Sequence, residues 1–339
     1  MRLVRPLPTN HGPRHERLAR AARACALLLV LLPALAACGG RARPQAPTIQ
    51  VKPVPAANYP RPELLADTAW LAGRLDDPAV RIIDLSPLAD YRRGHIPGAV
   101  HLWWQDLIEV HNDTYGMLVD PASRRRVLGA AGIQPAMTVV AYDNEGGRYA
   151  AYLLWVLTYT DYAAGRLLNG GLDTWRTEGR PVTRAVPTIA PTTLADRPTN
   201  EAVLYNAKDL LPRLGERDLA IVDARSTAEV NETWGGRLRL PGRIPNARSI
   251  PWERNLGQKG TEVVREPGEL SSAVYAGLRP DQEVIVYALT GVEAAHTFWI
   301  MRVLGYSRVK LYDGSWAEWG VATPSRPYPV EPPAVGRKP

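Results

Sequence analysis

Sulfur is scarce in this chain of 339 residues, which contains two cysteines, Cys25 and Cys38, and four methionines. Both cysteines lie near the amino terminus, so the rest of the chain offers no thiol for a disulfide, a cysteine-ligated metal or covalent sulfur transfer. The six histidines form no HxxxH pair after residue 37, and the phosphate-loop sequence GxxxxGK does not occur. We therefore expect no bound metal and no cofactor.

Acidic residues are rare in the first 37 positions, which contain six arginines and one glutamate. The formal charge of the whole chain is +7, but residues 38–339 hold 35 basic and 33 acidic side chains. The excess of positive charge therefore belongs to the amino-terminal segment rather than to a patch on a folded domain. We expect no binding to nucleic acid.

A charge-free hydrophobic run extends from Ala24 to Ala37, directly after the arginine-rich head. This pattern is typical of a signal peptide over residues 1–37, and the run is too short to span a bilayer comfortably as a permanent helix. Its end, Leu-Ala-Ala followed by Cys38, resembles the lipobox of bacterial lipoproteins. That resemblance implies a lipid on Cys38 that attaches the protein to a membrane of the bacterial cell envelope, outside the cytoplasm. An ordinary secretory signal that ends near a cysteine is the alternative.

Proline-rich stretches divide the remaining sequence into two pieces of nearly equal length. The predicted boundaries are a tether at 38–60, a first domain at 61–185, a linker at 186–200, a second domain at 201–325 and a tail at 326–339.

The two pieces repeat one another. Four short motifs recur in the same order at offsets of 139 to 148 residues: 82–85 with 221–224, 94–99 with 242–247, 138–143 with 283–288, and 169–175 with 313–319. Short apolar runs such as 138–142 and 283–287 are typical of buried parallel strands, and helical patterns lie between them. The sequence thus predicts two tandem α/β domains, each a mainly parallel sheet flanked by helices, with functional sites at the carboxyl ends of the strands.

Three of these motifs carry a resemblance to a known family. Residues 94–99 read GHIPGA, residues 223–225 read DAR, and residues 312–319 read YDGSWAEW. Together they resemble the tandem-domain rhodaneses, the thiosulfate and mercaptopyruvate sulfurtransferases. The resemblance implies two rhodanese-like domains, of which the second carries the catalytic cysteine after the tyrosine of its fourth strand. Here that position is Ala288, so no catalytic residue is assigned.

The loop that follows is the degenerate active-site loop: Ala288, Leu289, Thr290, Gly291, Val292 and Glu293. In the family, such a loop aims backbone N–H groups at one sulfur, and the residues after the cysteine are commonly cationic. Here Leu289 and Thr290 follow, and the expected pocket neighbours are Arg225 and Glu229. Two unit charges about 4 Å apart interact by about 4 kcal/mol at an effective dielectric constant near 20, so Glu229 and Glu293 would oppose an anion.

The first domain has an equivalent loop, formed by Asp143, Asn144, Glu145, Gly146, Gly147 and Arg148. Tandem rhodaneses usually have an aspartate at its first position and an inactive first domain, so the resemblance implies a supporting role. His296 lies just beyond the degenerate loop, and we interpret it as a structural histidine.

Three functional hypotheses remain open. The first is a catalytically silent lipoprotein that binds a small anion or a protein partner, or serves as a scaffold. The second is a sulfurtransferase that works by an unrecognised route. The third is a sensor of sulfur oxyanions or phosphate that uses the backbone amides of the loop. The position of the two glutamate carboxylates relative to those amides decides between an anion site and a site that favours cations.

Overall fold

The computed structural model describes residues 53–226, 230, 240–257, 263–321 and 328–332, which belong to one compact unit. Cys38, most of the expected tether and Glu229 lie outside the described residues.

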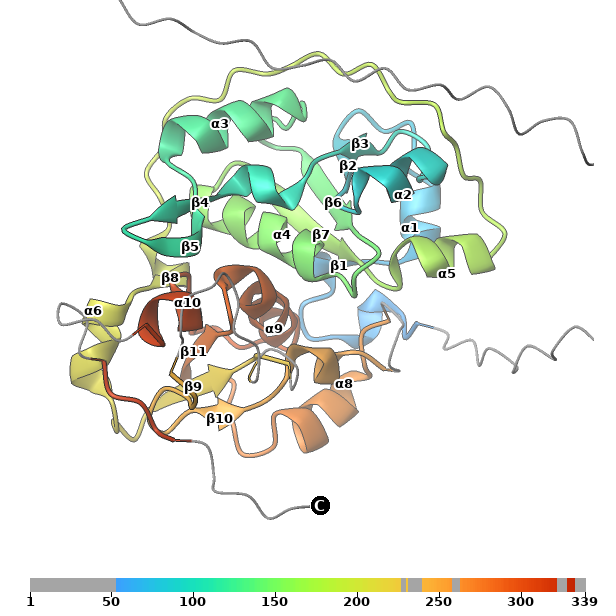
Figure 1. The fold of residues 1–339 in the computed structure, drawn as a ribbon. Coiled ribbons are helices and arrows are strands. Elements are labelled where there is room, and N and C mark those ends of the chain that lie inside the picture. Colours follow the sequence, from blue (N-terminus) through green and yellow to red (C-terminus); the bar gives the residue numbers. More distant parts are fainter. Residues whose placement is uncertain (1–52, 227–229, 231–239, 258–262, 322–327, 333–339) are drawn as a thin grey trace, which may run out of the picture. The chain divides into compact units, whose positions relative to one another are not determined.

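The first half of this unit is built around a parallel sheet of five strands in the order β1-β7-β6-β2-β3 (Figure 1). The strands are β1 (Leu65–Ala66), β2 (Val80–Asp84), β3 (Val100–His101), β6 (Thr138–Tyr142) and β7 (Ala164–Leu168). The helices are α1 (Thr68–Ala72), α2 (Leu88–Arg93), α3 (Pro121–Ala130), α4 (Arg148–Thr160) and α5 (Gly171–Thr177), with short 3₁₀ turns η1 (Ala56–Asn58), η2 (Pro62–Leu64) and η3 (Trp104–Leu107).

The second half repeats this topology, with a parallel sheet in the order β8-β12-β11-β9-β10. Its strands are β8 (Leu204–Tyr205), β9 (Leu219–Asp223), β10 (Arg248–Ser249), β11 (Glu283–Tyr287) and β12 (Val309–Tyr312). Its helical elements are η4 (Glu201–Val203), α6 (Ala207–Leu210), η5 (Leu211–Arg213), η7 (Trp252–Asn255), α8 (Pro267–Glu269), the π-helical η8 (Leu270–Val274), α9 (Gly291–Val303) and α10 (Ser315–Trp319). The predicted α/β class, with parallel sheets flanked by helices, is confirmed.

The central strands of both sheets consist of buried side chains, as their unbroken apolar sequences predict. In β11 all five residues are buried, and four of the five are in β6 and β9. Equivalent pairs close the two sheets at their carboxyl ends, because Asp84 lies beside Tyr142 and Asp223 beside Tyr287. The loops that follow Tyr142 and Tyr287 therefore leave the sheets at equivalent places.

Helices α4 and α9, which begin at the ends of these two loops, pack against each other and share one hydrophobic cluster. Each helix also sends a tryptophan to the other half of the unit. The indole Nε1–H of Trp155 on α4 donates to the carbonyl of Val203 at 3.2 Å, and that of Trp299 on α9 donates to the carbonyl of Leu64 at 3.0 Å. The two acceptors occupy equivalent positions, just before the first strand of each sheet. Each half therefore donates a tryptophan hydrogen bond to the same place in the other half, an exchanged contact.

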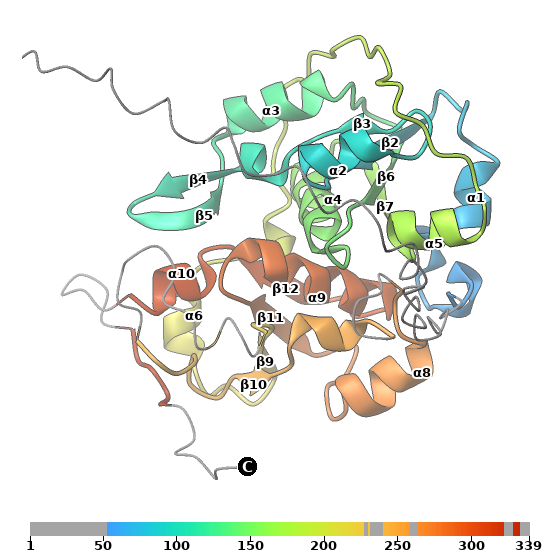
Figure 2. The same cartoon turned by 45° about the vertical axis from the view of Figure 1, so that its right-hand side comes forward.

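An antiparallel hairpin, β4 (Ile108–His111) and β5 (Thr114–Leu118), belongs to the first half but lies beside α9 and α10 of the second (Figures 1 and 2). Its two-residue turn, Asn112 and Asp113, has positive φ angles of 46° and 64°. Two consecutive residues in this region are the signature of a type I′ turn, which matches the twist of a hairpin.

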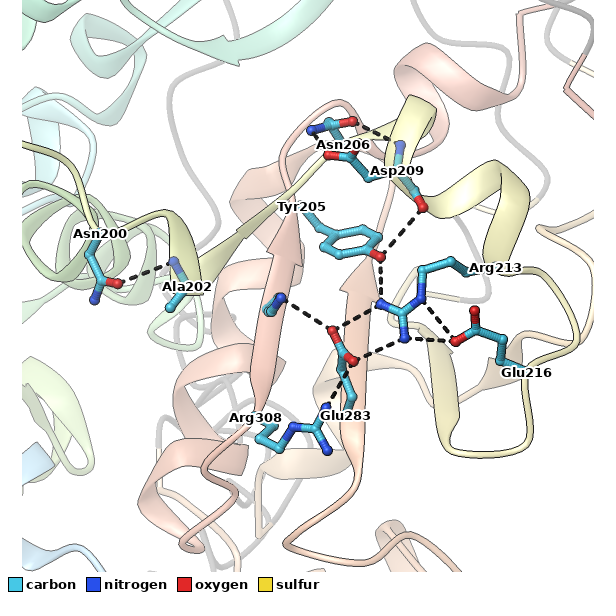
Figure 3. A network of polar contacts seen from close by, with 10 residues as sticks. Asn200, Ala202, Tyr205, Asn206, Asp209, Arg213, Glu216, Glu283 and Arg308 are labelled. Carbon is cyan, nitrogen blue, oxygen red and sulfur yellow. Dashed lines mark hydrogen bonds and ion pairs between the residues drawn. The ribbon is translucent and has the colours of Figure 1, made fainter.

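An ion-pair network fixes the opposite, amino-terminal end of the second sheet (Figure 3). The buried carboxylate of Glu283, the first residue of β11, contacts Arg213 at 3.1 Å, Arg308 at 3.1 Å and Lys310 at 3.2 Å. Burial alone would raise the pKa of Glu283, but the bonds from Arg213 and Lys310 outweigh it and hold the pKa below its usual range. Because Glu283 and the degenerate loop lie at opposite ends of β11, this network is structural.

We predict that Trp155→Phe and Trp299→Phe each lower the free energy of unfolding by about 1–3 kcal/mol, because each leaves a buried carbonyl without its donor. Urea unfolding followed by circular dichroism measures this change. Equal effects are expected, since the two bonds are equivalent by the internal repeat. A loss at only one of the two positions would contradict the exchanged-contact interpretation.

Candidate functional site

Ala288 follows β11 directly and is completely buried. Its backbone is held by the start of α10, since the N–H of Ala288 donates to Ser315 Oγ at 3.2 Å and its carbonyl accepts from the N–H of Trp316 at 3.0 Å. The carbonyl of the next residue, Leu289, accepts from the N–H of Ala317 at 2.9 Å, and its side chain packs in the core of the second sheet. The first two loop positions are therefore core positions, and Leu289 cannot supply the charge of the cation expected there.

Thr290 and Glu293 close the remainder of the loop on itself. Thr290 is the N-cap of α9, and its hydroxyl accepts from the N–H of Val292 at 3.3 Å. The carboxylate of Glu293 accepts from the N–H of Thr290 at 3.1 Å and from its hydroxyl at 2.7 Å. This reciprocal arrangement is a capping box, in which the helix satisfies its own free donors. Glu293 thus places its carboxylate against the backbone amide and the hydroxyl of Thr290.

In the equivalent loop of the first half, the carboxylate of Asp143 accepts hydrogen bonds from backbone amides. One carboxylate oxygen accepts from the N–H groups of Glu145 at 2.7 Å and Gly147 at 2.8 Å. The other accepts from Tyr149 at 2.8 Å and Ala150 at 2.9 Å. Four backbone amides therefore converge on one buried carboxylate, which is the geometry of an occupied anion site.

The loop of Asp143 packs against the second half of the unit. A Cβ atom on Gly146 would lie 2.8 Å from the ring of Trp252, and one on Gly147 would lie 3.7 Å from His296. The φ angles of Gly146 and Gly147 are 80° and 84°, which disfavours side chains at both positions, and at Gly146 the close ring of Trp252 is a second reason. The guanidinium of Arg148 lies between the rings of Tyr149, at 4.8 Å, and Trp252, at 5.7 Å. The other two loop residues, Asn144 and Glu145, are exposed.

His296 is completely buried, in keeping with its interpretation as a structural residue. The side-chain amide of Asn255 donates to His296 Nδ1 at 3.1 Å and to Thr297 Oγ1 at 3.1 Å, and Tyr275 donates to the amide oxygen of Asn255. Because Nδ1 accepts, the ring proton lies on Nε2. Burial lowers the pKa of His296 to about 3, so the ring is neutral and has no free lone pair with which to activate a nucleophile.

Arg225 is committed to the carboxylate of Asp223. Its Nε and Nη2 atoms donate to the two oxygens at 2.9 and 2.6 Å, and Nη2 also donates to the carbonyl of Gly242 at 2.7 Å. Tyr287 donates to the same carboxylate at 2.8 Å, and the guanidinium lies 4.4 Å from the ring of Trp316. The buried pair is neutral as a unit, so Arg225 does not supply an uncompensated positive charge to an anion. In the first half Ser86 replaces the arginine beside Asp84, and burial raises the pKa of Asp84.

Two residues that sequence reasoning did not single out complete the surroundings of the degenerate loop. A Cβ atom on Gly116 of β5 would lie 2.8 Å from Thr290 Cγ2, so the hairpin backbone lies directly against the loop. Asp313 lies on its other side, where a Cβ atom on Gly291 would lie 2.5 Å from Oδ1. The second oxygen, Oδ2, accepts from the N–H of Leu118 at 2.9 Å. Gly116 is 174 positions from Thr290, and the sequence contains no signal for this contact.

A comparison with protein families matches the rhodanese-like domain twice, at residues 67–178 and 206–322. The chain belongs to the rhodanese family. The repeated sheet topology, the Asp223–Arg225 strand end and the loop after Tyr287 are therefore features of a tandem rhodanese, and the family resemblance seen in the sequence is confirmed.

Several curated rhodanese relatives match over most of their length. The sulfur carrier protein TtuD of Thermus thermophilus is 32% identical over 277 residues, which are 77% of this chain and 95% of the relative. The thiosulfate sulfurtransferase of Pseudomonas aeruginosa is 32% identical over 268 residues, 76% of this chain and 94% of the relative. The solved structure of YnjE has a TM-score of 0.69 at 26% identity, covering 82% of this chain and 70% of that one. An ergothioneine biosynthesis enzyme from Chlorobium limicola matches with a TM-score of 0.69 at 23% identity, covering 81% and 72%, and shares the fold.

We predict that the rhodanese unit loses stability as the pH falls from about 6.5 toward about 3, partly through His296. Its pKa is lower in the folded chain than in the unfolded chain, so only the unfolded chain binds a proton in this range and acid favours unfolding. The contribution is at most about 1.4 kcal/mol per pH unit. Urea unfolding at several pH values measures the slope, and His296→Asn, which keeps an acceptor for Asn255, should flatten it. An unchanged slope in this variant would show that His296 does titrate in the folded state.

Proposed function

We propose that this rhodanese is catalytically silent and acts as a binding or scaffold module at the membrane surface of the bacterial cell envelope. The observation that carries the proposal is the loop after Tyr287, where a buried methyl group occupies the nucleophile position and a carboxylate takes the loop donors. Curated relatives are called a sulfur carrier protein and thiosulfate sulfurtransferases, so the difference lies in the site rather than in the fold.

The residues around Ala288 offer no replacement for a thiolate. Thr290 carries a hydroxyl group in the loop, but it donates its proton to Glu293 and is buried beneath β5. The hydroxyl of Ser315, which accepts from the N–H of Ala288, is also buried and donates to the carbonyl of Tyr312 at 2.8 Å. An unactivated hydroxyl is a poor nucleophile, and its oxygen cannot form the disulfide-type bond of a persulfide. Glu293 and the neutral His296 both argue against the alternative of a sulfurtransferase with an unrecognised route.

The sensor hypothesis is also disfavoured, on electrostatic grounds. A sulfate, sulfite or phosphate needs free amide donors, but Asp143 already accepts from four amides of the first loop, and Glu293 accepts from the Thr290 N–H of the second. An incoming anion would also be repelled by the charge of Glu293. Two like charges about 4 Å apart repel by about 4 kcal/mol at a dielectric constant near 20. A protein partner or a ligand without negative charge fits this site better than a small anion.

Attachment to the membrane is the second part of the proposal. The sequence around Cys38 supports a lipid anchor, and the proline-rich residues that follow would hold the folded unit away from the bilayer. Among the described residues, no helix is long and apolar enough to cross a membrane.

We predict that the purified protein transfers no sulfur from thiosulfate or mercaptopyruvate to cyanide. Ala288→Cys alone should remain at least 100-fold slower than an active thiosulfate sulfurtransferase assayed in parallel, because Glu293 still takes the N–H of Thr290 and repels the anionic donor substrate. Ala288→Cys combined with Glu293→Gln should be faster than the single variant, and Glu293→Gln alone is the matched control. Turnover by the unaltered chain, or an added sulfur atom on it in a mass spectrum, would overturn the silent assignment.

We predict that Cys38 determines the cellular location. In a bacterial host that processes lipoproteins, the unaltered chain should incorporate labelled fatty acid and appear in the membrane fraction, while Cys38→Ser should lose both properties. Cys25→Ser is the matched control, because it changes the other cysteine within the hydrophobic run and should behave like the unaltered chain. Membrane attachment that survives Cys38→Ser would contradict the lipid anchor without affecting the argument on Ala288.

A further inference from the structure

The β4–β5 hairpin covers the degenerate loop at close range. Gly116 lies at a φ angle of 87° and presents bare backbone to the side chain of Thr290. Any side chain at position 116 would both strain the backbone and overlap Thr290, so this glycine allows the closest possible approach. Thr290 is 5% exposed and Glu293 is 9% exposed, which means that the loop is closed to ligands while the hairpin is in place.

One hydrogen bond joins the last residue of β5 to Asp313, which lies beside the degenerate loop. The N–H of Leu118 donates to Asp313 Oδ2 at 2.9 Å, across 195 positions of sequence. Asp313 is buried, and its other oxygen, Oδ1, has no hydrogen-bond partner among the described residues. The same is true of the hydroxyl of Tyr152 on α4, which interacts electrostatically with Asp313. A buried carboxylate oxygen without a donor carries a desolvation cost that admission of water would remove.

The hairpin also lies outside both five-stranded sheets. Strands β4 and β5 pair only with each other within the described part of the chain. A two-stranded hairpin is marginally stable by itself and takes its order from what it packs against. In β4 Ile108 is buried but Val110 is 64% exposed, so part of this strand faces solvent, while Gly116 of β5 lies against the loop.

We propose that the β4–β5 hairpin is a hinged cover over residues 288–293, latched by the bond between Leu118 and Asp313, and that the second-domain loop becomes accessible to a ligand only when this cover opens. The proposal goes beyond the proposed function, because a cover controls access whether or not the loop is catalytically silent.

The latch should depend on pH. Burial, helped by the charge of Glu318 on α10 and opposed by the Leu118 N–H and Arg124 on α3, raises the pKa of Asp313 to about 7. The other groups of this cluster are Tyr152 on α4 and, beyond it, Glu293 on α9 and Tyr115 on β5. Since the closed state binds a proton on Asp313 more tightly than an open, hydrated state would, a rise in pH through about 7 favours opening.

A single introduced thiol can report on the cover. In the full chain with both Cys25 and Cys38 changed to serine, Thr290→Cys places the only thiol beneath the hairpin, and Ser272→Cys places one on an exposed surface as the matched control. We predict that maleimide labelling at position 290 is at least ten-fold slower than at 272. Adding Asp313→Ala or Leu118→Pro, each of which removes one partner of the latch, should accelerate labelling at 290 at least ten-fold and leave 272 unchanged.

Two further variants separate the cover from general unfolding. Leu118→Ala keeps the backbone N–H and Asp313→Asn keeps an acceptor, so both should label slowly at 290. The ratio of the two labelling rates should rise between pH 6 and pH 8 in the unaltered latch and stay constant in Asp313→Asn. Equal labelling of 290 and 272 with the latch intact, or no acceleration by either latch-breaking change in a protein with native circular dichroism, would overturn the cover. Neither result would bear on sulfur transfer, which is tested separately at Ala288.

Discussion

The structure depends above all on the backbone amides that are left without partners where a buried parallel strand gives way to a helix. Such amides need acceptors, and the positive end of the helix favours an acceptor with negative charge. In this chain Asp143 accepts from four such amides in the first domain, and Glu293 accepts from the N–H of Thr290 in the second. A geometry that elsewhere suits a bound anion or thiolate here stabilises the chain itself.

The two domains differ in which side chain supplies the acceptor, and this affects what each loop can do. Asp143 stands at the first loop position and gathers four amides from in front of the helix. Glu293 stands at the last position and folds back on Thr290, which leaves the first position to the methyl group of Ala288. The first loop is consequently locked against Trp252 and His296 of the second domain, whereas the second is covered by one hairpin of the first domain. Both loops thus lie where the two domains meet, but only the second lies beneath a hairpin whose strands, among the described residues, pair only with each other.

Much of this fold could be predicted from sequence, because the signals are local and repeated. Unbroken apolar runs at 138–142 and 283–287 predict buried parallel strands, and both are such strands. The absence of a cysteine at position 288 needs no structure at all. In contrast, the direction of the Glu293 side chain stayed open, since a residue at the start of a helix can face its own N-cap or a ligand. The pairing of Arg225 with Asp223 was missed as well, although the two residues are separated by one position and both are buried. Gly116 could not be found by local reasoning, because it meets the loop only through the packing of one domain on the other. Asp313 meets the loop through the fold of the second domain itself.

The alanine and the glutamate of the degenerate loop are best understood as one change rather than two. A thiolate at position 288 would need the loop amides to hold its pKa down, and burial without those donors raises the pKa of a thiol instead. A carboxylate at position 293 that already takes the N–H of Thr290 competes for those donors and adds a like charge at short range. With the glutamate in place a cysteine would lose the ionisation on which its chemistry depends, and without the cysteine the amides would lose their acceptor. With Glu293 present, a cysteine at position 288 has no chemical advantage over alanine. With Ala288 present, position 293 need not be free of negative charge.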